Sequence, residues 1–166
     1  MLPIPIGTDR PRRRFPWMNV LIIAANVVCY VLSHQIGQPR VGPPSPAGLA
    51  PGWDAWMLYP THPRLEQFIT YQFLHENFTH ILFNMLFLWV FGNNLNEKLG
   101  NIAYLFFYLT GGVLAGCGQL LSSSAPTLGA SGAISAVTVL FFVLLPRTNL
   151  RMFIFLFVYV DIWEIP

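Results

Sequence analysis

Charge is scarce in this sequence. Of its 166 residues only 10% are Asp, Glu, Lys or Arg, whereas 54% are hydrophobic and 15% are aromatic. A soluble domain carries about 25% charged residues and about 45–50% apolar ones. So little charge cannot cover the surface of a soluble protein, and disordered chains are polar and rich in charge. The composition therefore excludes both classes and indicates an integral membrane protein.

Cysteine is nearly absent as well. Cys29 and Cys117 both lie within apolar segments, so neither a disulfide framework nor a zinc site is indicated. The formal net charge of +2 is too small for a nucleic-acid-binding protein, and we expect no nucleic acid among the partners. The lipid bilayer is the partner that the composition predicts.

Long apolar runs are abundant. Four of them, residues 15–33, 78–95, 102–121 and 128–145, approach the roughly 20 residues that a membrane-spanning helix needs. The first follows a basic tail, residues 1–14, but it is longer than a signal-peptide core and no clear cleavage site follows it, which favours a retained helix. A fifth run, 152–160, is short. We predict an all-α, polytopic transmembrane bundle over 15–166, with four complete helices and the start of a fifth.

The basic residues predict the orientation, because cytoplasmic loops of membrane proteins are enriched in Lys and Arg. With the N-terminus inside, the inner side has Arg10, Arg12, Arg13, Arg14, Lys98, Arg147 and Arg151, and the outer side has Arg40 and Arg64. The helices at 78–95 and 128–145 then both begin near the outer face. The connection 35–67, with Trp53, Trp56 and Tyr59, suits a first loop partly embedded in the outer interface.

Polar residues gather where the second helix begins. His80 and Asn84 are four residues apart and share one helical face, so their donors point the same way. Such donors could form an oxyanion hole, which stabilises the negative oxygen of an acyl-transfer intermediate. They could also form hydrogen bonds between helices, and the spacing alone favours this second interpretation.

His75 and His80 also invite a metal interpretation. The metalloprotease motif places two histidines at i and i+4 on one helical face, whereas these two are five residues apart. No clear third ligand is evident. We therefore expect no metal and no cofactor.

A serine lies where the fourth helix begins. Gly129-Ala130-Ser131-Gly132 resembles a nucleophile turn, although it lacks the spacing of the hydrolase motif Gly-x-Ser-x-Gly. The same residues form small-x-x-x-small pairs, which are typical of closely packed membrane helices. Ser131 taken alone is thus explained by packing more often than by catalysis, and the two roles are compatible.

The two polar clusters together resemble the rhomboid family of intramembrane serine proteases. The stretch 75–92, HENFTHILFNMLFLWVFG, is similar to the second rhomboid helix, and Gly129-Ala-Ser131-Gly132 is similar to the family's nucleophile motif. Both motifs occur in order, and the resemblance runs from about residue 15 to the end.

The resemblance implies a serine endopeptidase that cleaves transmembrane protein substrates. Ser131 would be the nucleophile, and His80, Asn84 and the backbone N–H of Ser131 would form the oxyanion hole. His75 would shape the site, and Gly129 and Gly132 would support the nucleophile motif. A bacterial inner membrane is the expected location.

Two features depart from the family. Its Trp-Arg pair in the first loop is missing, since Gln67-Phe-Ile-Thr-Tyr71 occupies that region. Its general base is a histidine on the sixth helix, yet the histidines here are at 34, 62, 75 and 80, all before Ser131. We expect a truncated protease whose base lies beyond residue 166. The alternative is a catalytically dead relative that binds transmembrane segments. A transporter is less favoured, because no inverted repeat is evident.

Overall fold

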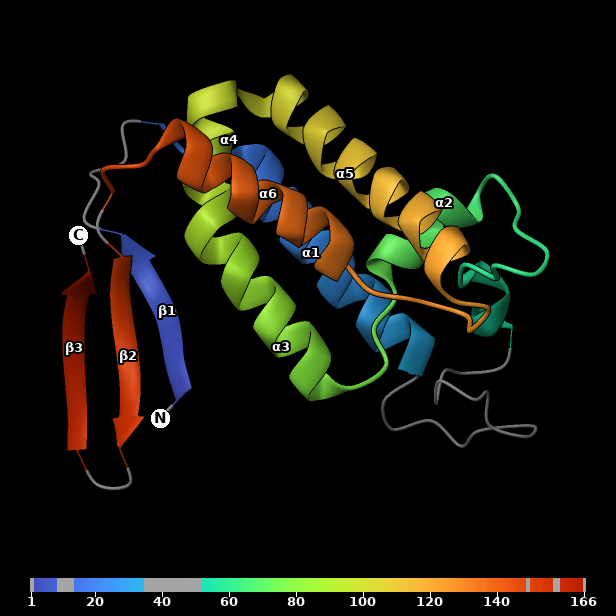
Figure 1. Ribbon diagram of the computed structural model, residues 1–166, viewed down its shortest axis with the longest axis horizontal. Helices are drawn as coiled ribbons and strands as arrows, with labels where there is room; N and C mark the ends of the chain where they lie inside the picture. Colours follow the sequence, from blue (N-terminus) through green and yellow to red (C-terminus); the bar gives the residue numbers. More distant parts are fainter. Residues whose placement is uncertain (1, 9–13, 35–51, 149, 157–158, 166) are drawn as a thin grey trace.

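Four helical segments form the body of the molecule in the computed structural model, which describes residues 2–8, 14–34, 52–148, 150–156 and 159–165 (Figure 1). The segments are α1 (Trp17–His34), the continuous run of α3 (Phe78–Phe87), η3 (Leu88–Gly92) and α4 (Asn93–Leu99), then α5 (Asn101–Ser122) and α6 (Ser131–Leu144). The prediction of a helical bundle is confirmed for this body. Residues 35–51, the first part of the expected embedded loop, lie outside the described residues.

The bundle buries polar side chains within a mainly apolar core, and it exposes large apolar side chains on its surface. Ten polar side chains are buried among the residues whose burial the structure describes: Asn19, Asn26, Ser33, Gln67, Gln72, His75, Asn84, Asn93, Asn94 and Asn96. Large apolar side chains such as Trp17, Leu21, Phe106, Leu114 and Val143 are exposed. A soluble protein has the reverse arrangement, whereas lipid accepts an apolar surface. Among the described residues, α1 and α5 are long and apolar enough to cross a membrane, and α6 is a shorter apolar helix.

Helix α6 lies between α5 and α3, with α1 behind it (Figure 1). Small residues let α6 approach α5 closely. A Cβ on Gly132 would overlap with the Cβ of Ala115, and one on Gly111 would come within 2.7 Å of the Cβ of Ala136. Membrane helices associate through such close contacts between small residues. The packing role predicted for the Gly-rich start of α6 is therefore observed at Gly132.

A polar network fixes α1 to the second helix at η3, a π-helical segment. The side-chain nitrogen of Asn19 donates to the carbonyl of Leu88 (2.8 Å) and to Oδ1 of Asn93 (2.8 Å). The hydroxyl of Tyr104 donates to Oδ1 of Asn19. A π-helical turn disturbs the regular backbone ladder, and a buried amide restores partners for its polar groups.

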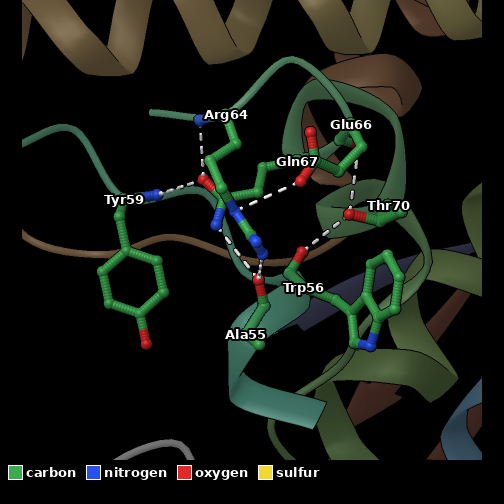
Figure 2. A network of polar contacts seen from close by, with 7 residues as sticks. All are labelled: Ala55, Trp56, Tyr59, Arg64, Glu66, Gln67 and Thr70. Carbon is green, nitrogen blue, oxygen red and sulfur yellow. Dashed lines mark hydrogen bonds and ion pairs between the residues drawn. The ribbon is translucent and has the colours of Figure 1, made fainter. Parts of the chain in front are cut away.

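The segment before α3 folds as short helical turns: η1 (Trp53–Trp56), α2 (Gln67–Thr70) and η2 (Tyr71–Phe73). Figure 2 shows how polar side chains hold this segment together. Nε2 of Gln67 donates to the carbonyl of Ala55 (3.0 Å), and its Oε1 accepts from the N–H of Arg64 (3.1 Å). The hydroxyl of Thr70 donates to the carbonyl of Trp56 (2.9 Å). The loop is thus anchored without the family's Trp-Arg pair.

The two chain ends form a small antiparallel sheet in the order β1 (Leu2–Thr8), β2 (Leu150–Leu156), β3 (Tyr159–Ile165). The prediction that a fifth helix starts at 152–160 is therefore wrong, because the described residues of this segment form strands. The segment is rich in β-branched and aromatic residues, which favour strands, and it is too short to span a bilayer. Pro3 and Pro5 lie on the edge strand β1, where proline is tolerated.

Candidate active site

Ser131 is the first residue of α6, and it is exposed. The chain enters the helix through Gly129, whose φ of +121° suits glycine. The N–H of Gly129 donates to the carbonyl of Tyr71 (2.9 Å), which fixes the turn against η2. The first N–H groups of a helix have no partner within it, so the backbone at Ser131 offers donors beside the hydroxyl.

His80 lies directly against this turn. A Cβ on Gly129 would be 2.8 Å from Cε1 of His80, 2.9 Å from its Nε2 and 3.9 Å from Oγ of Ser131. The imidazole of His80 and the hydroxyl of Ser131 therefore flank the same point. The structure thus brings together two residues that are 51 positions apart in the chain.

Asn84 lies one turn further along α3 on the same face as His80. Helix α3 begins because the side chain of Asn77 caps it, accepting the N–H of His80 (2.9 Å). Asn84 is buried, and its Nδ2 has no hydrogen-bond partner among the described residues. Buried polar groups are normally paired, so this unpaired donor marks Asn84 as a candidate functional residue.

His75 supports the site from behind. Its ring lies 5.1 Å from that of His80, edge to face. The side chain is fully buried, and neither ring nitrogen has a partner among the described residues. Burial, and secondarily the nearby His80, lowers the pKa of His75 to about 4. His75 is therefore neutral at pH 7 and places no fixed charge behind the site.

A cavity of about 380 Å³ opens beside His80. Its described walls come from the loop before α3, from the start of α3 and from the segment before α6: Met57, Tyr59, Glu76, His80, Pro126, Thr127 and Leu128. Its size falls within the range of small-ligand pockets. The cavity gives the His80 imidazole access to a bound molecule.

Sequence reasoning missed the residues that hold this cavity open. Leu58 and Thr127 exchange both backbone hydrogen bonds (3.0 and 2.9 Å), so the first loop is clamped to the segment before α6. Tyr71 adds the contact to Gly129 through its carbonyl. No local pattern marks these contacts, because backbone groups of any residue can make them. The one hint in the sequence is the glycine at position 129, a residue type that can adopt the positive φ found there.

Of the expected site residues, His80 is the one among the described cavity walls, and Ser131 and Asn84 do not line the cavity. Gly132 packs against Ala115 of α5, so its contribution is to helix packing. Among the described residues, no group of three or more His, Cys, Asp or Glu side chains is arranged to hold a metal ion. The metal interpretation of His75 and His80 thus gains no third ligand within this part of the chain.

The fold and this geometry define a class of protein: an apolar-surfaced helical bundle that encloses a polar site built from two helix starts. The comparisons with known proteins agree with this description. A family model described as the Rhomboid domain matches residues 62–165. The chain belongs to the rhomboid family. Its membership makes it a membrane protein, in line with the two apolar helices of spanning length among the described residues.

Curated relatives carry the name rhomboid protease GlpG. The proteins from Yersinia pestis (strain Pestoides F) and Yersinia pseudotuberculosis serotype O:3 (strain YPIII) are each 30% identical over 143 residues, which is 80% of this chain and 48% of theirs. The protein from Photorhabdus laumondii is 27% identical over 120 residues, covering 72% of this chain and 39% of its own. The chain spans about half the length of the curated relatives it matches, or less.

Proposed function

We propose that this chain carries the nucleophile and oxyanion-binding part of an intramembrane serine endopeptidase. Ser131 is the nucleophile, and its substrates are peptide bonds in or near transmembrane segments of membrane proteins. The observation that supports this most strongly is the approach of His80 and Ser131 to one point beside Gly129. The name of these relatives, rhomboid protease, supports the same reaction class.

The reaction is an acyl transfer. Oγ of Ser131 attacks the carbonyl carbon, its proton passes to a general base, and a tetrahedral oxyanion forms. The C–N bond then breaks, the leaving amine takes the proton, and an acyl-enzyme remains. Water, entering through the cavity beside His80, repeats the sequence in reverse and releases the acid product.

The oxyanion hole is assigned to His80, Asn84 and the N–H of Ser131. Asn84 supplies a buried side-chain donor without a partner among the described residues, and His80 supplies a ring nitrogen beside the serine. Losing one such donor typically slows acyl transfer about 100- to 1000-fold. We therefore expect Asn84→Ala to reduce cleavage strongly while substrate affinity changes little.

The general base is proposed to be a histidine contributed from beyond residue 166. All four histidines of this chain precede Ser131. The matched stretch covers 48% of the Yersinia relatives, which leaves about half of their length to carry other site residues. We propose that the N-terminus faces the cytoplasm and that the site opens toward the outer leaflet of a bacterial inner membrane, in line with the bias of Lys and Arg.

The test compares two proteins in lipid bilayers: residues 1–166, and the same chain extended to the end of its open reading frame. A fluorescent transmembrane peptide reports cleavage, and a fluorophosphonate probe reports an activated serine. The extended protein is expected to show both signals, and Ser131→Ala is expected to abolish both. Ser122→Ala is the matched control, because Ser122 lies at the end of α5 and its hydroxyl donates to the carbonyl of Gly118 (3.0 Å).

Three results would contradict the proposal. Cleavage that persists in Ser131→Ala would remove this serine from the mechanism. Binding of the peptide by the extended protein, with neither cleavage nor labelling, would instead identify a catalytically dead member of the family. Inhibition by a chelator would point to a metal and away from serine chemistry.

A further inference from the structure

The cavity beside His80 has an unusual combination of walls. Met57, Pro126 and Leu128 are apolar, and Tyr59 adds an aromatic face. Glu76 is the only described lining residue with a formal charge at pH 7, and it lies at the exposed rim. Apolar walls with one carboxylate among them suit a long aliphatic side chain that ends in a cation.

The position of Glu76 is fixed by the fold. Its carbonyl accepts a hydrogen bond from Nε2 of His34 (3.0 Å), the last residue of α1. The next residue, Asn77, caps α3. The rim carboxylate therefore projects from a backbone that is held at both sides, which reduces the ordering cost of binding a partner.

The apolar wall formed by Met57, Tyr59 and Leu128 is also held in place by the fold. Met57 is buried and packs with Leu74, and Tyr59 and Leu128 pack against this pair. The backbone pairing of Leu58 with Thr127 joins the two sides. A preformed apolar wall of this kind does not have to rearrange when a side chain enters.

The electrostatic surroundings reinforce the negative rim. Burial, and secondarily the carboxylate of Asp54, raises the pKa of the Tyr59 phenol. The Asp54 carboxylate therefore acts on the same wall as a second negative group. Arg64, the described arginine of this loop, is engaged elsewhere: it pairs with Glu66 (3.2 Å) and donates to the carbonyl of Ala55 (2.8 Å). Concave sites with one sign of charge concentrate the opposite sign.

We propose that this cavity is a specificity pocket that selects substrates with a Lys or Arg near the scissile bond. The aliphatic stem lies along Met57 and Leu128, and the cation reaches the carboxylate of Glu76. This selectivity presupposes the proposed function, since it names the substrate class of that same site. The residue that determines it, Glu76, lies outside the nucleophile and oxyanion machinery.

The test measures binding rather than cleavage, in Ser131→Ala protein reconstituted at low ionic strength and pH 8. The probes are fluorescent transmembrane peptides identical except for one residue, which is Lys, Leu or Glu at each juxtamembrane position in turn. At one position the Lys peptide is expected to bind about three- to tenfold more tightly than the Leu peptide, and the Glu peptide more weakly. The preference should shrink at high salt, because salt screens the charge pair.

Three variants give the matched comparison. Glu76→Gln should abolish the preference for Lys, and Glu76→Lys should reverse it in favour of the Glu peptide. Glu97→Gln is the control, since Glu97 belongs to α4 at the far end of the second helix and should leave the preference unchanged. The reversal guards against a simple folding defect, because a misfolded variant would bind no peptide selectively.

The outcomes separate this inference from the function it presupposes. If wild-type full-length protein labels with the fluorophosphonate probe but all peptides bind equally, the pocket does not select a cation and the inference is overturned alone. A Lys preference that survives Glu76→Gln also overturns it. If no peptide binds and Ser131 does not label, both the inference and the proposed function fail.

Discussion

Gly129 lies against the imidazole of His80 so closely that no side chain fits between them. A Cβ on Gly129 would be 2.8 Å from Cε1 of His80, and the φ of +121° at Gly129 is one that residues with a side chain rarely adopt. Both constraints act at the turn that leads into Ser131. The glycine therefore sets the separation between the candidate nucleophile and the candidate oxyanion donor.

Replacing this glycine should disable the site. Gly129→Ala must displace His80 or the turn, and it also strains the backbone, which costs about 1–3 kcal/mol. We expect the rate of fluorophosphonate labelling at Ser131 to fall at least about 100-fold, consistent with misplacing a catalytic donor. Gly118→Ala is the control, because a Cβ there meets nothing within 4 Å. Equal labelling of both variants would show that the close approach is unimportant.

The glycine and the alanine that meet at positions 132 and 115 should be interchangeable. Gly132→Ala makes two Cβ atoms overlap, and we expect a loss of about 1–3 kcal/mol of unfolding free energy from overpacking. The double variant with Ala115→Gly removes the clash, since the next neighbour of a Cβ at 132 is 3.6 Å away. Denaturant unfolding in micelles measures both. Failure of the second substitution to restore stability would mean that this contact does not set the separation of α5 and α6.

Composition and periodicity were enough to predict the helical body and its polar clusters. A membrane helix leaves a strong local signal, because about 20 consecutive residues must be apolar. The pairing of His80 with Asn84 on one face follows from helical geometry alone. The candidate site residues could be predicted for a related reason. A polar residue inside an apolar run is costly in lipid, so it is rare and usually functional.

Contacts between distant segments are not encoded in any local pattern. The Leu58–Thr127 pairing uses backbone groups, which every residue carries. The anchoring of the first loop through Gln67 takes the place of the arginine expected from the resemblance. The apolar 152–160 segment has the composition of either a helix start or a strand, and pairing with β1, at the other end of the chain, decided the outcome in the structure.

Asn19 should be essential for stability. Its side chain bonds Leu88, Asn93 and Tyr104 within the interior, and its backbone N–H donates to Oδ1 of Asn96. Asn19→Leu leaves several buried polar groups unpaired, and we expect it to cost about 2–4 kcal/mol of unfolding free energy. Tyr104→Phe removes one of these bonds and should cost about 1 kcal/mol. Similar unfolding midpoints for Asn19→Leu and the wild type would show that the network adds nothing.

Buried His75 should make the protein acid-sensitive. Its pKa is about 4 in the folded protein, below the value near 6.5 of an unfolded chain, so the unfolded state binds more protons between these limits. Stability is therefore full above about pH 6.5 and is lost as the pH falls toward 4, by on the order of 3 kcal/mol. Unfolding curves at several pH values measure this. His75→Gln should flatten the profile, and the exposed His62→Gln should not; an unchanged slope in His75→Gln would assign the acid sensitivity to another group.

Gln67 should hold the first loop in place for substrate entry. Its amide joins the carbonyl of Ala55 to the N–H of Arg64, and its Oε1 also lies 3.5 Å from the N–H of Tyr59, which lines the cavity (Figure 2). Gln67→Leu removes every one of these bonds, so we expect faster amide exchange over residues 53–66 and weaker peptide binding. Gln67→Glu keeps the acceptor toward Arg64 but loses the donor to Ala55, so it should give an intermediate result. Glu66→Gln weakens only an exposed ion pair and should change exchange little. Exchange that is the same in Gln67→Leu as in the wild type would mean that the loop is held by its apolar contacts alone, with Met57 and Leu74 as the elements to test next.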